Sequence, residues 1–192
     1  MVSPGILLTG VTAGVVRRME QDFISAGRLR SSTSGLVYAT YGAHVVMTAL
    51  AARRPVLPLP TPTKGSGVLG AAVGAAGVGV LAAGAGVFPT AAQVSGTQAG
   101  ELVTDGIYRW SRNPQYLAYL LGCAGFGLAR RSGDALVLAS WAGFVLTYWI
   151  RREEDNLTRI FGSDYLAYRS RTGRWLSLPP THPASARSRQ VE

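Results

Sequence analysis

The chain has 192 residues, enough for one domain, and 47% of them are hydrophobic while only 15% are charged. Soluble globular domains typically carry about 25% charged residues, so the composition argues against an ordinary soluble protein. The formal net charge of +9 suggests nucleic acid as a partner. However, the basic residues are not gathered on one soluble module with interleaved aromatic residues, so we expect no nucleic acid partner. Composition favours an integral membrane protein.

Residues 1–35 are expected to form an N-terminal interfacial or partly inserted helical unit. The apolar run 5–16 is short for a span and precedes Arg17 and Arg18, whereas a signal peptide has its basic residues first. Residues 17–34 alternate charged and apolar side chains. This pattern predicts an amphipathic helix lying on the membrane surface.

Four apolar stretches follow, and a spanning helix needs about 20 such residues, with roughly 17 at the short end. They predict spans near residues 36–52, 67–88, 115–129 and 135–150. The last two are short and close together, which indicates a tight helical hairpin. The expected fold class is therefore all-α, a polytopic membrane bundle of about four spans within a domain covering residues 36–180.

Glycines are frequent in the second predicted span. Gly70 and Gly74 have the four-residue spacing that lets two helix backbones approach closely. A flexible linker is the alternative, but the valines and leucines of the same stretch disfavour it. We expect this helix to pack tightly against a neighbour.

The distribution of basic residues predicts that both termini face the cytoplasm. In that orientation 14 of the 19 basic residues lie inside, as the positive-inside rule requires, although Arg53 and Arg54 lie outside. The orientation places two polar clusters, residues 106–116 and 151–154, on the same cytoplasmic face.

Cysteine and histidine provide no expected metal site. Cys123 is the single cysteine of the chain, so no disulfide framework is available, and it is expected to pack inside a span. His44 and His182 have no recognised metal-ligand spacing with it. His44 is better interpreted as a hydrogen-bonded core residue.

The first polar cluster allows two interpretations. Pro114 is expected in the first turn of a helix, where the unpaired amides, with Arg112, Tyr108 and Tyr116, could bind an anionic or hydroxyl group of a ligand. The alternative is an aromatic belt at headgroup depth, with arginines reaching for lipid phosphates. These residues alone do not decide between the two.

The second polar cluster follows directly on the fourth apolar stretch. Glu153 and Glu154 are about 100° apart on a helix, so they cannot face the same way. We expect one to pair with Arg151 or Arg152 and the other to remain free for a cationic ligand. A salt-bridge patch at the end of a helix is the alternative.

The order and spacing of these residues resemble a known family. The carrying motifs are Gly106-x-Tyr108, Arg112-Asn113-Pro114-x-Tyr116, Glu153-Glu154-x-x-Leu157-x-x-x-Phe161-Gly162-x-x-Tyr165-x-x-Tyr168 and the closing stretch 174–179. Over roughly residues 90–180 the chain resembles the isoprenylcysteine carboxyl methyltransferase and phospholipid methyltransferase family of integral membrane enzymes.

The resemblance implies a methyltransferase that uses S-adenosylmethionine. It places the cofactor on Gln93, Gly100, Glu101, Leu102, Val103, Tyr108, Asn113, Pro114, Gln115, Tyr116 and Glu153. Arg112, Glu153 and Tyr116 are expected to position the reactants, and no protein nucleophile is required. The acceptor is expected to be lipophilic and to enter from the bilayer, with residues 157–175 as a lid and the site on the cytoplasmic side of a bacterial membrane.

Two departures from the family pattern bear on the acceptor. Asn113 stands where eukaryotic members have histidine, and Trp149 stands where prenylcysteine enzymes have the arginine that holds the substrate carboxylate. The candidates for substrate binding are therefore Trp149, Arg151 and Arg152. An amine, thiol, phenol or lipid headgroup is as possible as a carboxylate.

Two other functions remain open from the sequence. A membrane sterol reductase that uses NADPH has a similar hairpin, although the paired glutamates favour the methyltransferase. A non-catalytic membrane protein that keeps only the fold is the third possibility. Residues 181–192 are polar and are expected to form a disordered tail.

Overall fold

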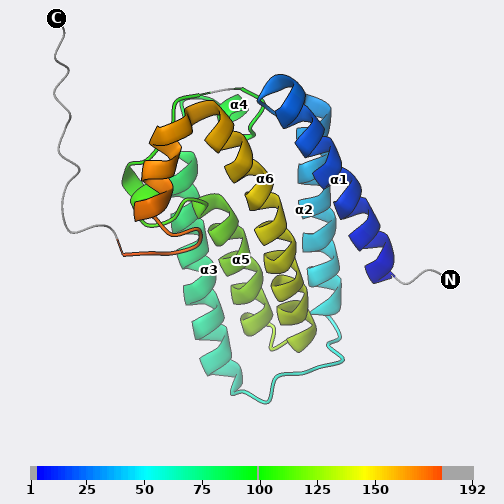
Figure 1. Ribbon diagram of the computed structural model, residues 1–192. Coiled ribbons are helices and arrows are strands. Elements are labelled where there is room, and N and C mark those ends of the chain that lie inside the picture. The colour runs from blue at the N-terminus through cyan, green and yellow to red at the C-terminus, as the bar shows by residue number, and fades with distance from the viewer. Residues whose placement is uncertain (1–3, 99, 179–192) are drawn as a thin grey trace, which may run out of the picture.

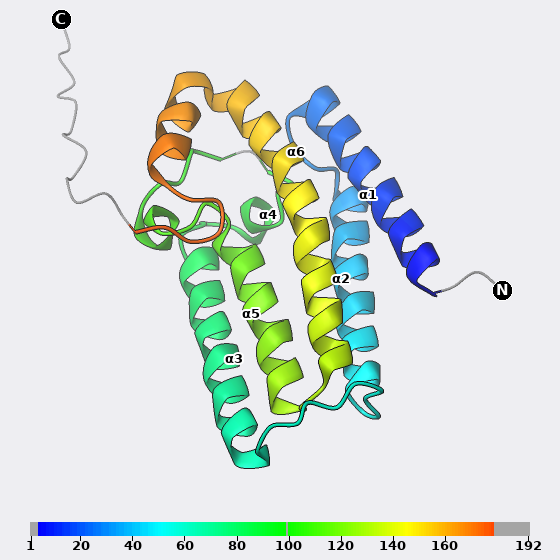
Figure 2. The same ribbon diagram turned by 60° about the horizontal axis from the view of Figure 1, so that its bottom comes forward.

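The structure is a computed structural model that describes residues 4–98 and 100–178, so the predicted tail at 181–192 lies outside the described residues. Its helices are α1 (Pro4–Ala26), α2 (Ser31–Ala51), α3 (Thr63–Ala85), α4 (Ala91–Val94), the 3-10 helix η1 (Gly106–Arg109), α5 (Pro114–Ala129) and α6 (Gly133–Arg171). The long helices stand side by side in the order α3, α5, α6, α2, α1 (Figures 1 and 2). Within the described ranges the only β pairing is an isolated bridge between Pro58 and Ser132. The predicted all-α class is confirmed.

Two helices, α3 and α6, are long and apolar enough to cross a membrane. They contain most of the predicted span 67–88 and all of 135–150, and the other two predicted spans coincide largely with α2 and α5. Only 17% of the apolar window of α3 and 39% of that of α6 is buried inside the protein. Apolar helix surface this exposed suits contact with lipid rather than with water.

The N-terminal region differs from its prediction. A single surface helix over residues 17–34 is wrong, because α1 ends at Ala26, Gly27 has a φ of +65° and α2 begins at Ser31. The predicted boundary after residue 35 falls inside α2. Met19 and Phe23 of α1 are buried in a core that α1 shares with α2 and α6. The apolar half of the amphipathic pattern therefore faces other helices.

Helices α3 and α5 are in backbone contact. A Cβ added to Gly70 would lie 2.4 Å from the Ala129 nitrogen, and one added to Gly125 would lie 2.6 Å from the Gly74 nitrogen. No side chain fits at Gly70 or Gly125, so the close packing predicted from Gly70 and Gly74 is confirmed. The contact holds the start of α3 against the end of α5, and at the other end Gly84 of α3 lies against Pro114 at the start of α5.

Helices α5 and α6 form the predicted tight hairpin, joined by residues 130–132. The hydroxyl of Ser132 caps α6 by accepting a hydrogen bond from the Ala135 nitrogen at 3.1 Å. At roughly 1.5 Å per residue, the 39 residues of α6 are longer than the hydrocarbon core of a bilayer. The apolar part of α6 ends at Ile150, so its later turns extend beyond the membrane.

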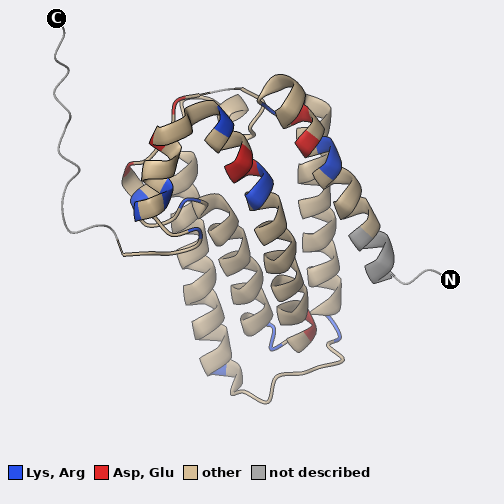
Figure 3. Cartoon of the chain, in the orientation of Figure 1, with Lys and Arg blue, Asp and Glu red and all other residues tan. Residues whose placement is uncertain are grey.

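The second polar cluster lies inside α6 and not at a helix end, which corrects the salt-bridge patch considered from the sequence. Within α6 the non-helical residue is Gly162, whose φ is +51° and ψ −123°, and the helix turns sharply there. Charged residues gather at the two ends of the bundle and leave its middle largely uncharged (Figure 3). Residues 151–154 therefore lie at one end, at the junction with the apolar segment.

Candidate functional site

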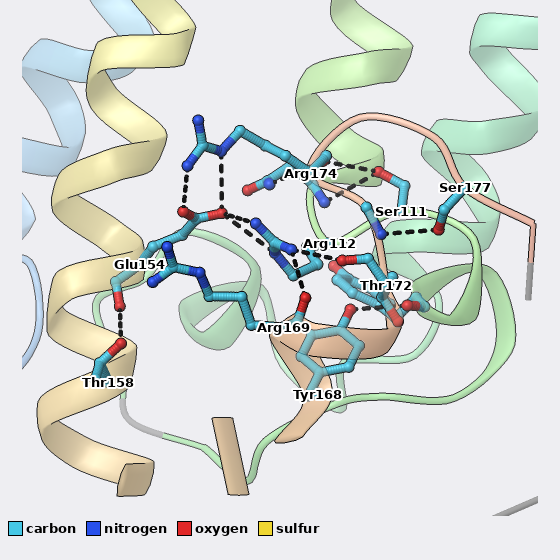
Figure 4. Close-up of polar contacts among 12 residues, drawn as sticks. Ser111, Arg112, Glu154, Thr158, Tyr168, Arg169, Thr172, Arg174 and Ser177 are labelled. Atoms are coloured by element: carbon cyan, nitrogen blue, oxygen red, sulfur yellow. Dashed lines mark hydrogen bonds and ion pairs between the residues drawn. The ribbon is translucent and has the colours of Figure 1, made fainter. Parts of the chain in front are cut away.

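Glu154 is held between two arginines at the polar end of the bundle (Figure 4). The Nη2 atom of Arg112 lies 2.6 Å from its Oε1, and Nη2 of Arg174 lies 2.6 Å from its Oε2. The Nε atoms of both arginines donate to Oε1 at 3.2 Å. Burial raises the pKa of Glu154, but the hydrogen bonds and charges of Arg174 and Arg112 outweigh it and hold the pKa below its ordinary value.

Arg112 also ties the C-terminal segment to the bundle. Its Nη1 donates to the carbonyls of Arg169 at 3.1 Å and Thr172 at 2.5 Å, and its backbone nitrogen donates to the Gly173 carbonyl. Arg112 is therefore committed to the fold at every nitrogen of its guanidinium. The role that the sequence predicted for Arg112, positioning the reactants, stays a prediction, and what the structure adds is that Arg112 holds the C-terminal segment in place.

The start of α5 is held by the same segment. Asn113 donates from Nδ2 to the Arg174 carbonyl at 3.1 Å, so its side chain does not cap the helix. Pro114 occupies the first turn as predicted and packs on Gly84, where an added Cβ would lie 3.2 Å from its ring. Asn113 and Pro114 thus serve to place Gln115 and Tyr116, the next residues.

Glu153 faces a different partner. Tyr116 donates its hydroxyl to Oε1 of Glu153 at 2.5 Å. Burial raises the pKa of Glu153 to about 7, the hydrogen bond from Tyr116 opposes this, and the charge of Glu154 adds to it. The predicted pairing of one glutamate with Arg151 or Arg152 is wrong, because Glu154 binds the distant Arg112 and Arg174 and Glu153 binds a tyrosine.

Tyr108 lies at the centre of a second apolar cluster. It is 8% exposed, its hydroxyl donates to the Gly84 carbonyl at 3.4 Å, and its carbonyl accepts from the Tyr168 hydroxyl at 2.7 Å. Gln115 interacts with its hydroxyl. The other members of the cluster are Phe88, Leu102, Val103, Ile107, Leu157, Phe161, Tyr165 and Tyr168. Three predicted cofactor residues, Leu102, Val103 and Tyr108, are thereby brought against the later turns of α6.

Gln93 carries an unpaired polar atom. Its Oε1 is buried and has no hydrogen-bond partner in the part of the chain that the structure describes. Its Nε2 lies 3.2 Å from where a Cβ on Gly100 would be, so Gly100 leaves room for the amide. Glu101 is exposed beside them. A buried carbonyl oxygen without a partner costs about 1–3 kcal/mol, which a ligand N–H would offset.

The three candidates for substrate binding do not gather at one point. Trp149 is 1% exposed within the core. Arg151 is exposed, and Arg152 pairs with Glu20 at 3.3 Å and lies over the ring of Tyr148 at 5.2 Å. Arg152 is therefore directed toward α1 and away from Glu153.

Sequence reasoning missed several groups that build the site. Arg174 was part of the closing motif, but nothing in the sequence indicated that it would bind Glu154. Tyr41 of α2 lies beside Tyr116 and was not identified at all. The local signal was misleading, because Arg151 lies three residues before Glu154, one helical turn away, and so favoured an ion pair within the same helix.

No group of three or more His, Cys, Asp or Glu residues within the described ranges is arranged to hold a metal ion. The site is thus built from two glutamates, two arginines, tyrosines and amide groups.

Comparison with known proteins places this arrangement in a family. Residues 67–164 match the family described as phospholipid methyltransferase, a segment that makes up half of the chain and contains Tyr108, Arg112, Tyr116, Glu153 and Glu154. The chain belongs to the phospholipid methyltransferase family. Family membership and the apolar helices together indicate a membrane protein. Family membership also supports methyl transfer as the activity.

One curated relative is the protein-S-isoprenylcysteine O-methyltransferase of Saccharomyces cerevisiae. It is 32% identical over 78 residues, which cover 38% of this chain and 30% of the relative. The match therefore spans less than a third of the length of the yeast protein. No solved structure matches this family member. Helices α1 and α2 and Arg174 lie outside the family segment.

Proposed function

We propose that the protein transfers a methyl group from S-adenosylmethionine to a lipophilic acceptor at the cytoplasmic face of the membrane. The observation that carries the proposal is the Tyr116–Glu153 pair. It lies inside the family segment and at the junction between the apolar and polar parts of α6. Glu153 is a half-buried carboxylate whose described hydrogen bond comes from a tyrosine and not from an arginine.

The residues present fit the cofactor. S-adenosylmethionine carries a sulfonium and an ammonium, which a carboxylate and aromatic faces stabilise. Glu153, Tyr108 and Tyr116 supply these groups. The orphaned Oε1 of Gln93 is an acceptor for an N–H donor, and the amides at the start of α5 suit a carboxylate. When bound, the cofactor would supply the electrophilic methyl group.

The chain's own residues would align the reactants and exclude water. The Arg112–Glu154–Arg174 clamp fastens residues 172–178 across the start of α5. Tyr165 and Tyr168, both buried against Tyr108, would close the same side as a lid. Alignment of two reactants can lower a barrier by roughly 7–11 kcal/mol, so no nucleophilic side chain is required.

The acceptor would reach the site from the bilayer, since the outer faces of α3 and α6 are apolar and exposed. The lipid bilayer is therefore the expected partner surface. The proposal does not depend on the oligomeric state, because all residues of the proposed site come from one chain.

The test is binding of labelled S-adenosylmethionine to the purified protein in lipid nanodiscs. We expect saturable binding and about tenfold weaker binding in Gln93→Ala and in Glu153→Ala, since each removes one polar contact worth roughly 1.4 kcal/mol. Gln98→Ala is the matched control, because Gln98 is exposed on the same loop.

Three outcomes separate the alternatives. A folded protein that binds no S-adenosylmethionine contradicts the proposal. Binding of NADPH instead would support a reductase. Absence of both would support a non-catalytic role for the fold.

A further inference from the structure

One face of α6 carries Glu153, which belongs to the proposed cofactor site, and Trp149, which does not. Trp149 and Glu153 are four residues apart and therefore lie on the same face of the helix. Trp149 is 1% exposed, and its Nε1 donor has no hydrogen-bond partner in the described ranges. An N–H group buried without an acceptor costs about 1–3 kcal/mol, so a bound group with a lone pair would stabilise this position.

Aromatic side chains from α2 and α5 surround this face. The ring of Tyr41 lies edge-on to Trp149 at 5.5 Å and tilted to Tyr119 at 5.0 Å. Its hydroxyl lies beside that of Tyr116, which in turn binds Glu153. Tyr38, 52% exposed, packs edge-on to Tyr41 at 6.3 Å. The aromatic residues thus form a continuous line from the outer surface of α2 to Glu153.

His44 of α2 is hydrogen-bonded at both ring nitrogens. Its Nε2 lies 3.0 Å from the Leu138 carbonyl, and its Nδ1 lies 2.5 Å from the Tyr119 hydroxyl. The ring thereby links α2 to α5 and α6 close to Tyr41.

No arginine of the described residues is directed at this face. Arg112 and Arg174 bind Glu154, Arg152 binds Glu20 and Tyr148, and the exposed Arg151 lies about 200° around the helix from Glu153. A carboxylate acceptor would meet the Glu153 carboxylate with no arginine beside it, and such repulsion is costly in a partly buried site. This face of α6 therefore disfavours a carboxylate.

The unpaired N–H of Trp149 distinguishes among the remaining candidate methyl acceptors. An ammonium suits Glu153 but has no lone pair for the Trp149 N–H, and thiol sulfur is a weak acceptor. A hydroxyl can accept from Trp149 and donate to Glu153 at the same time. Among hydroxyls, phenols have a pKa of about 10, close enough to a carboxylate base for proton transfer, and their rings suit an aromatic wall.

We propose that Trp149, Glu153, Tyr41 and Tyr116 form the acceptor pocket and that its acceptor is a lipophilic phenol. The proposal rests on the proposed function. The phenol oxygen would gain the methyl carbon as the carbon–sulfur bond of the sulfonium breaks, and the electron pair would stay on sulfur. Tyr116 occupies Oε1 of Glu153, so the phenol proton would go to Oε2.

The first test compares three probes that differ only in the polar group, with the wild-type protein in nanodiscs. The probes are 3-pentadecylphenol, 3-pentadecylaniline and 3-pentadecylbenzoic acid, each with labelled S-adenosylmethionine. We expect kcat/KM for the phenol to exceed the other two at least tenfold. Preference for the amine or the acid overturns the proposal, and so does absence of transfer to the phenol while the cofactor binds. If the cofactor itself does not bind, the proposed function fails instead.

The second test measures binding of the phenol probe without the methyl donor, by thermal stabilisation of the protein. Trp149→Phe keeps the ring and removes the N–H, so it should weaken phenol binding about tenfold and leave cofactor binding unchanged. Trp141→Phe on the same helix is the matched control. Equal phenol binding by Trp149→Phe and the wild type would contradict the pocket.

Discussion

Two adjacent glutamates have opposite environments, because consecutive helix positions face different neighbours. Glu154 lies 4% exposed between two guanidinium groups, whereas Glu153 faces a tyrosine at the edge of the apolar core. The first therefore stays ionised and holds the fold together. The second can change its protonation state near neutral pH, which suits a group that meets a ligand.

The role of Glu154 predicts a large loss of stability in Glu154→Gln. The change removes the charge that compensates Arg112, whose side chain is only 8% exposed, and breaking a buried pair in this way costs about 3–5 kcal/mol. Glu20→Gln breaks the more exposed pair with Arg152 and should cost less than about 1 kcal/mol. Thermal unfolding in detergent measures both, and equal midpoints for the two variants would contradict the assignment.

Glu153 predicts a pH dependence of methyl transfer. Burial raises its pKa to about 7, so the carboxylate is protonated and inactive as a base below that pH. kcat/KM should fall as the pH drops through about 7. Tyr116→Phe removes a hydrogen bond that lowers this pKa, so its acid limb should move to higher pH. A limb unchanged by Tyr116→Phe would show that another group titrates.

At the residue scale the sequence identified residues that come together in the structure, but it did not predict most of their contacts. Tyr108, Tyr116 and Glu153 were identified by spacing, and the structure brings them to one end of the bundle. Glu154 was assigned to its sequence neighbours, but its partners lie 42 residues before and 20 residues after it. The spacing of residues in the sequence indicates which of them share a helix face. It contains no information on which distant segment packs against that face.

At the scale of elements the apolar stretches predicted the positions of the long helices well. Two predictions were wrong, the separate surface helix over residues 17–34 and the helix end at residues 151–154, and both have the same cause. Residues 17–26 continue α1 as a packed helix, and residues 151–161 continue α6 beyond its apolar part. In both places charged residues lie on a helix that has already left the membrane core, so charge does not mark the end of the helix.

The α3–α5 contact predicts which glycines tolerate alanine. Gly70→Ala would place its Cβ 2.4 Å from the Ala129 nitrogen, and overpacking of this kind costs about 1–3 kcal/mol. Gly79→Ala, on the same helix, meets nothing within 4 Å and should be neutral or slightly stabilising, since alanine favours helix. Thermal midpoints in one detergent compare them, and similar destabilisation by both would exclude backbone contact as the cause.

At the scale of the molecule the family segment contains the residues of the proposed cofactor site, and the chain adds α1 and α2 beside it. Figure 2 shows α2 next to α6, where α2 contributes Tyr41 to the proposed acceptor pocket. Trp149, Glu153 and Tyr116 of the proposed pocket lie in the family segment, and Tyr41 joins them from outside it. No pattern in the sequence could place α2 there, because helix order in a bundle depends on packing between distant segments.

The charges at the two ends of the bundle predict its orientation. The end that carries the clamp holds most of the basic residues, so the positive-inside rule places it in the cytoplasm. Cys123, the native cysteine, is buried and should not react with a membrane-impermeant maleimide. Ser170→Cys should therefore be labelled only in inverted vesicles, and Lys64→Cys only in intact cells, since both positions are exposed at opposite ends. The reverse pattern would place the site outside, where S-adenosylmethionine made in the cytoplasm could not reach it.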